Sequence, residues 1–164
     1  MRCFIIFVLF LWAAPALAQD QRITTFILVR HAEKESNEKD PELSQIGMDR
    51  AKRLAELLKD SNISAVYSTR YKRTQQTVTP IAQLKNLAIR DYESLSNDDL
   101  RNLTSEHFGR TILIAGHSNT IPKIANALIG KEQFQNLHDA EFGIVFIISV
   151  LTPGKEASIL TLHY

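Results

Sequence analysis

The chain has 164 residues, a length typical of one domain, and carries 19 Lys and Arg against 18 Asp and Glu, a formal net charge of +1. This balance excludes the broad basic surface of a general nucleic-acid-binding protein, so no nucleic-acid partner is expected. The single cysteine, Cys3, excludes a disulfide within the chain.

Residues 1–18 are predicted to be a secretory signal peptide. Arg2 is followed by the apolar run 4–12 and by Ala16-Leu17-Ala18, which fits a cleavage site before Gln19. The alternative is an N-terminal membrane anchor, but the apolar run is short for a span of about 20 residues. We therefore expect a secreted or periplasmic protein without stable membrane insertion, whose single domain covers residues 19–164 and lacks Cys3.

The first half of that domain alternates between apolar runs and helical patterns. Residues 24–29 predict a strand buried on both faces, and the charged residues 33–42 predict a solvated loop. Ser44 is the expected N-cap of a helix running to about Asp60, because one face of this segment is apolar at helical spacing: Ala51, Leu54, Ala55 and Leu58.

Residues 65–67 predict a second strand, followed by a helix over 72–85. Ser68 or Thr69 is the expected cap of this helix, and Pro80 is expected to kink or split it. A short strand over 87–90 and a short helix over 98–106 follow.

Residues 111–115 predict another buried strand. Pro122 fits the first turn of a helix ending near Gly130, and the segments 142–151 and 157–162 predict a closing antiparallel hairpin. Strands that alternate with helices indicate an α/β fold, a three-layer α/β/α arrangement with a mostly parallel sheet. Such sheets bind ligands beyond the carboxyl ends of their strands.

Two histidines follow predicted strands at that edge of the sheet. Arg30-His31 ends the first strand, and Gly116-His117-Ser118 ends the strand over 111–115. A neutral imidazole is a nucleophile toward phosphorus, and guanidinium groups bind phosphoryl oxygens with paired hydrogen bonds. The pattern indicates a phosphate site.

The segment 28–33, Leu-Val-Arg-His-Ala-Glu, resembles the signature of the histidine phosphatase (phosphoglycerate mutase-like) superfamily. The segment 67–77, Tyr-Ser-Thr-Arg-Tyr-Lys-Arg-Thr-Gln-Gln-Thr, is similar to the family's second block, and 116–118 to its third. Residues 43–47, Leu-Ser-Gln-Ile-Gly, resemble the family's helix entry. The matches run in the family's order from residue 26 to residue 122.

The resemblance implies a phosphoglycerate mutase-like fold and a role for each matching residue. His31 becomes phosphorylated, while Arg30, Arg73 and His117 bind the transferring phosphoryl group. The amide of Ser118 is expected to donate a further hydrogen bond near the start of the Pro122 helix. The resemblance implies no cofactor and no metal. Arg70 is the rival of Arg73, and a metal site built on the two histidines is the rival of the phosphate site.

The family's general acid has no clear counterpart in this sequence. Glu93 is the first choice by position, Asp91 competes with it, and Glu33 is a third candidate because it follows His31 closely. Some small members resembling the phosphohistidine phosphatases lack this acid.

The resulting hypothesis is an exported, metal-independent phosphatase acting on a phosphorylated small molecule, glycan or protein. The alternatives are a phosphohistidine or phosphoprotein phosphatase, a phosphoglycerate-type mutase, and a phosphate-ligand binding protein with little turnover. Only about twenty residues lie between Arg90 and Thr111, so a small cap and an open pocket are expected.

Overall fold

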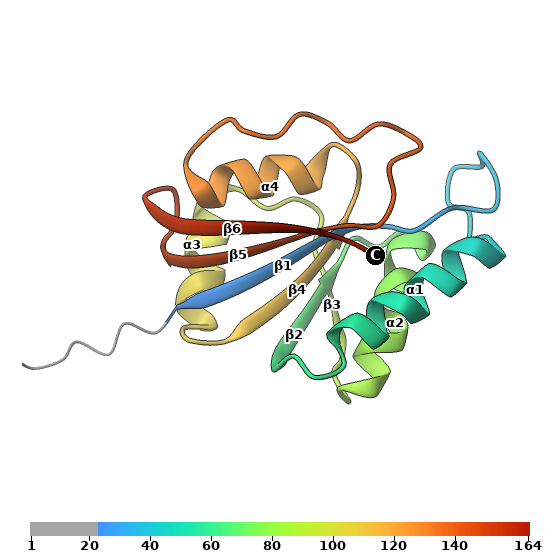
Figure 1. Cartoon of the computed structure of the whole chain (residues 1–164), viewed down its shortest axis with the longest axis horizontal. Coiled ribbons are helices and arrows are strands. Elements are labelled where there is room, and N and C mark those ends of the chain that lie inside the picture. The colour runs from blue at the N-terminus through green and yellow to red at the C-terminus, as the bar shows by residue number, and fades with distance from the viewer. Residues whose placement is uncertain (1–22) are drawn as a thin grey trace, which may run out of the picture.

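A buried strand, β1 (Thr24–Arg30), lies inside a six-stranded sheet with the order β3-β2-β4-β1-β5-β6 (Figure 1). The computed structural model describes residues 23–164, so the proposed signal peptide and Cys3 lie outside the described residues. β1 pairs in parallel with β4 and antiparallel with β5. The pairs β2–β3 and β2–β4 are parallel and β5–β6 is antiparallel, so the sheet is mixed, with its parallel part in the first four strands.

The elements follow the predicted order. Their bounds are β1 Thr24–Arg30, α1 Gln45–Leu58, β2 Ile63–Ser68, α2 Lys72–Leu84, β3 Ile89–Asp91, α3 Asn97–Glu106, β4 Thr111–Gly116, α4 Thr120–Ile129, β5 Ile144–Thr152 and β6 Glu156–His163. The C-terminal hairpin is confirmed, but β5 begins two residues later than expected, which leaves Phe142 outside the strand.

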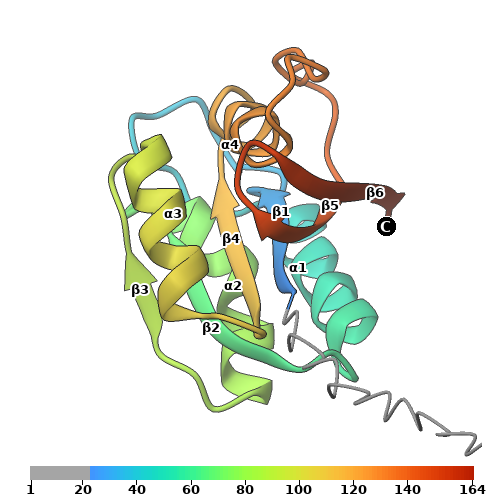
Figure 2. The ribbon, with the colours of Figure 1, turned by 90° about the vertical axis from the view of Figure 1, so that its left-hand side faces the viewer.

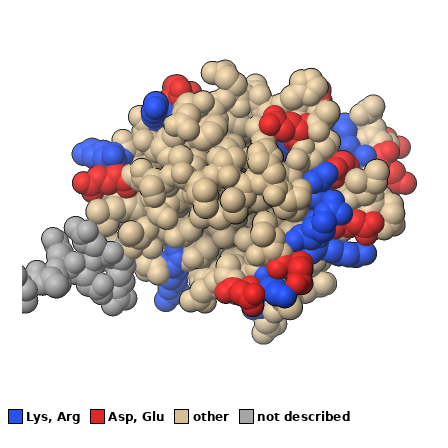
Figure 3. Space-filling view, in the orientation of Figure 1, with Lys and Arg blue, Asp and Glu red and all other residues tan. Residues whose placement is uncertain are grey.

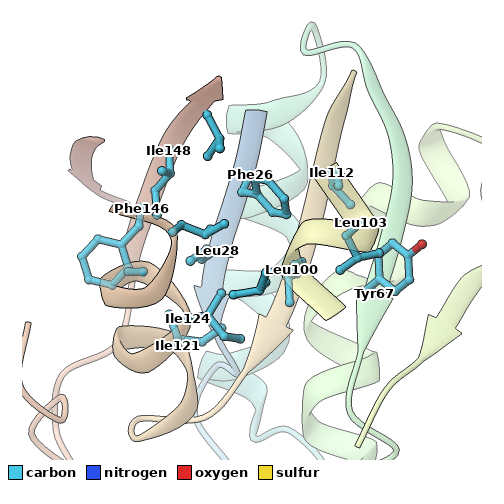
Figure 4. Close-up of a cluster of buried hydrophobic side chains, with 14 of the residues drawn as sticks. Phe26, Leu28, Tyr67, Leu100, Leu103, Ile112, Ile121, Ile124, Phe146 and Ile148 are labelled. Carbon is cyan, nitrogen blue, oxygen red and sulfur yellow. The ribbon is translucent and has the colours of Figure 1, made fainter. Parts of the chain in front are cut away.

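Helices cover both faces of the sheet and give three layers (Figure 2). Alternate residues of β1 point to opposite faces. Phe26 and Leu28 pack against α3 and α4 (Figure 4), whereas Ile27 and Val29 pack against α1 and α2. Full burial of each such side chain contributes about 1.5–3 kcal/mol, which explains why β1 is apolar on both faces.

Local chemistry fixes the ends of α1, α3 and α4, as predicted for Ser44 and Gly130 and not predicted for α3. The Ser44 side chain accepts from the Gly47 amide at the start of α1, and Ser96 and Asp99 form a capping box on α3. Gly130 ends α4 in the left-handed conformation with φ 68°, where a side chain would be strained.

The start of α2 differs from the prediction. Neither Ser68 nor Thr69 caps it, because both hydroxyls bond elsewhere, that of Ser68 to the Thr69 carbonyl and that of Thr69 to Thr74. Instead, Asp40 from the preceding loop accepts from the Lys72 amide at 2.9 Å. The helix also runs through Pro80 without being split.

Charged side chains of both signs are interspersed on the face seen in Figure 3, mainly toward the end of the molecule where α1 lies. Within residues 23–164, no helix is both long enough and apolar enough to span a membrane.

Candidate phosphate site

The strand register brings the two predicted histidines together. Arg30 lies opposite Gly116 in the parallel pair β1–β4, and the His31 amide donates to the Gly116 carbonyl at 2.9 Å. The next residue on each strand is a histidine, and the two rings meet edge to face with their centroids 5.5 Å apart. The sheet therefore places His31 and His117 side by side at its carboxyl edge.

His31 is buried, with only 6% of its surface exposed. The sequence pattern does not show this burial, because it does not show which loops fold over the edge of the sheet. Burial lowers the pKa of His31 from 6.5 to about 4; the carbonyl of Ala32 opposes this shift, while the charges of Arg73 and Arg30 add to it. At neutral pH the ring is uncharged.

The tautomer of His31 follows from its one ring hydrogen bond. Nδ1 lies 2.8 Å from the carbonyl oxygen of Ala32, and because a carbonyl only accepts, Nδ1 carries the proton. Nε2 then has a free lone pair. The arrangement suits a nucleophile.

Arg30 is held against the segment between α4 and β5. Its Nη1 donates to the carbonyls of His138 at 2.7 Å and Glu141 at 2.8 Å, and its Nη2 to that of Asp139 at 3.2 Å. The guanidinium also lies 4.3 Å from the ring centroid of Phe142. Nε is buried and has no hydrogen-bond partner among the described residues.

Arg73 and Arg70 occupy different environments. The Arg73 side chain is 15% exposed, lies 3.9 Å from Asp40 and packs over the ring of Tyr71 at 4.3 Å. The Arg70 side chain is 85% exposed and lies 3.7 Å from Asp91. Arg73 lines the cavity that contains His31, whereas Arg70 does not.

His117 contacts the start of α2. Its Nε2 lies 3.1 Å from the hydroxyl of Thr69, and its ring meets Tyr71 edge to face at 5.1 Å. Burial lowers its pKa to about 4, and the charges of Arg73 and Arg30 act in the same direction.

These groups surround a polar cavity of about 410 Å³. Its lining comprises Arg30, His31, Lys34, Asn37, Arg73, His117, Ser118, Asn119, Asp139 and Phe142. Five of the predicted site residues are therefore brought together: Arg30, His31, Arg73, His117 and Ser118. Within the described part of the chain, no group of three or more His, Cys, Asp or Glu side chains is arranged to hold a metal ion.

The three acid candidates lie outside this lining. Glu33 is bound by Arg50, with Nη2 to Oε1 at 2.6 Å, and this hydrogen bond lowers the pKa of Glu33. The Asp91 carboxylate accepts from Gln75 at 2.9 Å. Glu93 is exposed and lines a neighbouring cavity that shares His117 with the first.

Sequence reasoning missed five lining residues: Asn119, which directly follows Ser118, and four that come from two loops. Lys34 and Asn37 come from the loop that the sequence presents only as solvated, and Asp139 and Phe142 come from the segment after α4. Phe142 was predicted to begin a strand. No local pattern marks these four, because each reaches the site through the long-range folding of a loop.

The Leu43–Gly47 segment contacts the backbone that follows His31. A side chain at Gly47 would place Cβ 2.1 Å from the carbonyl oxygen of Glu33, so only glycine allows this approach. The Ser44 amide donates to the same carbonyl at 2.9 Å. The start of α1 thereby fixes the backbone two residues after His31.

Comparisons with known proteins agree with this geometry. Residues 26–100 match the family model of the histidine phosphatase superfamily (branch 1). Phosphoserine phosphatase 1 of Hydrogenobacter thermophilus is 43% identical over 70 residues, covering 38% of this chain and 33% of that protein. A probable phosphatase of Schizosaccharomyces pombe is 32% identical over 102 residues, covering 57% of this chain and 36% of that protein. The chain spans about a third of the length of these curated relatives.

Solved structures share the fold. A mycobacterial glucosyl-3-phosphoglycerate phosphatase superposes with a TM-score of 0.70 at 14% identity, over 87% of this chain and 99% of that one. The protein histidine phosphatase SixA in complex with tungstate also gives 0.70, at 15% identity, over 85% of this chain and 96% of that one. The α/β architecture expected from the sequence is confirmed.

Proposed function

We propose, because residues 26–100 match the family model of the histidine phosphatase superfamily, that this chain hydrolyses phosphomonoesters through a phosphohistidine intermediate on His31. One observation carries the proposal. His31, a neutral imidazole whose Nε2 is unprotonated, lines a polar cavity that is also lined by Arg30, Arg73 and His117.

In the first step, Nε2 of His31 attacks the phosphorus atom of the bound ester. A P–N bond forms while the bond from phosphorus to the leaving oxygen breaks, and that oxygen takes up a proton. The positive charge that develops on the imidazole is stabilised by the hydrogen bond from Nδ1 to the Ala32 carbonyl. Arg73 and Arg30, which line the same cavity, supply positive charge next to the phosphoryl oxygens.

The carboxyl group of Glu93 is proposed to supply the proton to the leaving oxygen. It lines the cavity that adjoins the phosphate cavity at His117, where a leaving group would extend. Asp91 and Glu33 are weaker candidates, because Gln75 and Arg50 occupy their carboxylates.

In the second step, a water molecule attacks the phosphorus and the P–N bond breaks. The proton lost by water goes to the carboxylate left by the first step, and inorganic phosphate is released. His31 returns to its neutral form, and the proposed cycle uses no metal ion.

The substrate and the cellular location are also proposals. The proposed substrate is a phosphorylated small molecule, glycan or protein. The signal peptide proposed at residues 1–18 would direct the domain to the periplasm or the exterior.

A phosphohistidine phosphatase is the second candidate. Glu33, Asp91 and Glu93 all lie outside the lining of the phosphate cavity. An imidazole is a better leaving group than an alkoxide, and its departure depends less on a positioned acid.

The test is hydrolysis of p-nitrophenyl phosphate by residues 19–164 with EDTA present, beside His31→Ala. EDTA-resistant activity that the variant lacks, together with acid-labile phosphate on the wild-type protein alone, would support the proposal. Activity that EDTA removes, or a variant with a near-normal rate, would overturn it.

A further inference from the structure

A second cavity of about 310 Å³ adjoins the phosphate cavity. Its lining comprises Thr69, Arg70, Tyr71, Tyr92, Glu93 and His117. His117 belongs to both linings, so a group attached to a phosphate bound by His31 can enter this space. Its volume is enough for one small ring.

Tyr92 forms a fixed wall of the second cavity. Its hydroxyl donates to the Ala115 carbonyl at 3.0 Å, and its amide donates to the Ser68 carbonyl at 3.0 Å. The ring also packs against the core on the α3–α4 side of the sheet. Because both ends of the residue are held by the sheet, its aromatic surface is set in place before any ligand binds.

Tyr71 stands where the two cavities meet. Its ring contacts His117 edge to face with centroids 5.1 Å apart, while the guanidinium of Arg73 lies 4.3 Å from the ring centroid. The side chain is nevertheless 41% exposed, so part of its surface remains free. A ring leaving the phosphate cavity would pass next to this surface.

The charges on this lining have opposite signs. Arg70 lies within 3.7 Å of Asp91, and Glu93 is the other charged residue of the cavity. Such a pair gives no net preference for an anionic or a cationic leaving group. The two aromatic rings are therefore the feature able to discriminate.

We infer that this cavity is the leaving-group subsite and that it selects phosphoryl groups attached to a planar aromatic ring, whether a phenol or an imidazole. The inference rests on the proposed function and narrows its substrate class. Aromatic pairs add an attraction beyond area burial that corresponds to about a twofold to tenfold gain in affinity. A saturated ring of the same size lacks that gain.

Three phosphonates test the subsite without turnover: methyl-, cyclohexyl- and phenylphosphonate, with each Kd measured by NMR titration of residues 19–164. We expect phenylphosphonate to bind about twofold to tenfold more tightly than cyclohexylphosphonate. Equal affinities for the two rings would overturn the subsite while leaving the proposed function intact. Failure of methylphosphonate to bind would count against the phosphate cavity itself.

Variants identify the ring responsible. Tyr71→Leu should abolish the preference for phenyl over cyclohexyl, Tyr71→Phe should keep it, and Phe108→Leu, at an exposed position after α3, serves as the control. Tyr71→Leu also removes the packing of Tyr71 against Arg73. This change affects the binding of both phosphonates alike, so it cancels in the ratio of their Kd values. An unchanged ratio in Tyr71→Leu would contradict the role of Tyr71.

Turnover then distinguishes the two kinds of ring. The KM values of phosphotyrosine and phosphohistidine are compared between wild type and Tyr71→Leu. A larger rise for one compound than for the other supports the subsite and identifies its ring, because a change at Arg73 affects both compounds alike. Unchanged values for both would overturn the inference.

Discussion

Replacing His31 with glutamine should weaken the dependence of the fold's stability on acid. His31 is buried and neutral, and its pKa falls from 6.5 to about 4 on folding. The unfolded chain, where the ring is solvated, therefore binds a proton at a higher pH than the folded protein does.

The sign and size of the effect follow from linkage. Because the folded-state pKa is depressed, the stabilising contribution of His31 is complete above pH 6.5 and is lost as the pH falls toward about 4. The whole difference corresponds to about 3 kcal/mol, of which about 2 kcal/mol is lost between pH values of about 7.5 and 5.

Urea denaturation followed by circular dichroism gives the free energy of unfolding at each pH, in buffers free of phosphate. The fall between about pH 7.5 and pH 5 should be about 2 kcal/mol smaller in His31→Gln than in the wild type. His163→Gln, at an exposed position, is the control and should keep the wild-type fall. Equal falls in His31→Gln and wild type would refute the burial of a neutral imidazole.

Three further outcomes are expected. Gly47→Ala should lower the free energy of unfolding by about 1–3 kcal/mol and reduce turnover, because the added Cβ meets the Glu33 carbonyl. Wild-type stability and turnover in this variant would refute the requirement for glycine at this position. Arg73→Ala should lower kcat/KM for p-nitrophenyl phosphate about 100-fold, and Arg70→Ala clearly less; the reverse order would assign the phosphate role to Arg70. Glu93→Gln should slow hydrolysis of alkyl phosphates about 100-fold while sparing p-nitrophenyl phosphate; equal losses would exclude Glu93 as the acid.

The sequence alone was sufficient for the order of elements and for the position of both histidines. Residues 24–29 and 111–115 are apolar on both faces, because each strand is covered by helices on both sides of the sheet. This pattern can be recognised from consecutive residues alone. Ser44 also predicts the start of α1 correctly, because an N-cap bonds to a backbone amide only a few residues away. Parallel neighbours then place His31 and His117 at one edge.

Tertiary structure decided what surrounds those histidines. The carbonyls that hold Arg30 come from residues more than 100 positions away, and the cap of α2 comes from Asp40 in a different loop. The depressed pKa of His31 and the cavity between Tyr71 and Tyr92 likewise arise only when separate loops fold over the sheet edge. Periodicity and capping are short-range and can be read along the chain, whereas burial and charge proximity depend on contacts between distant segments.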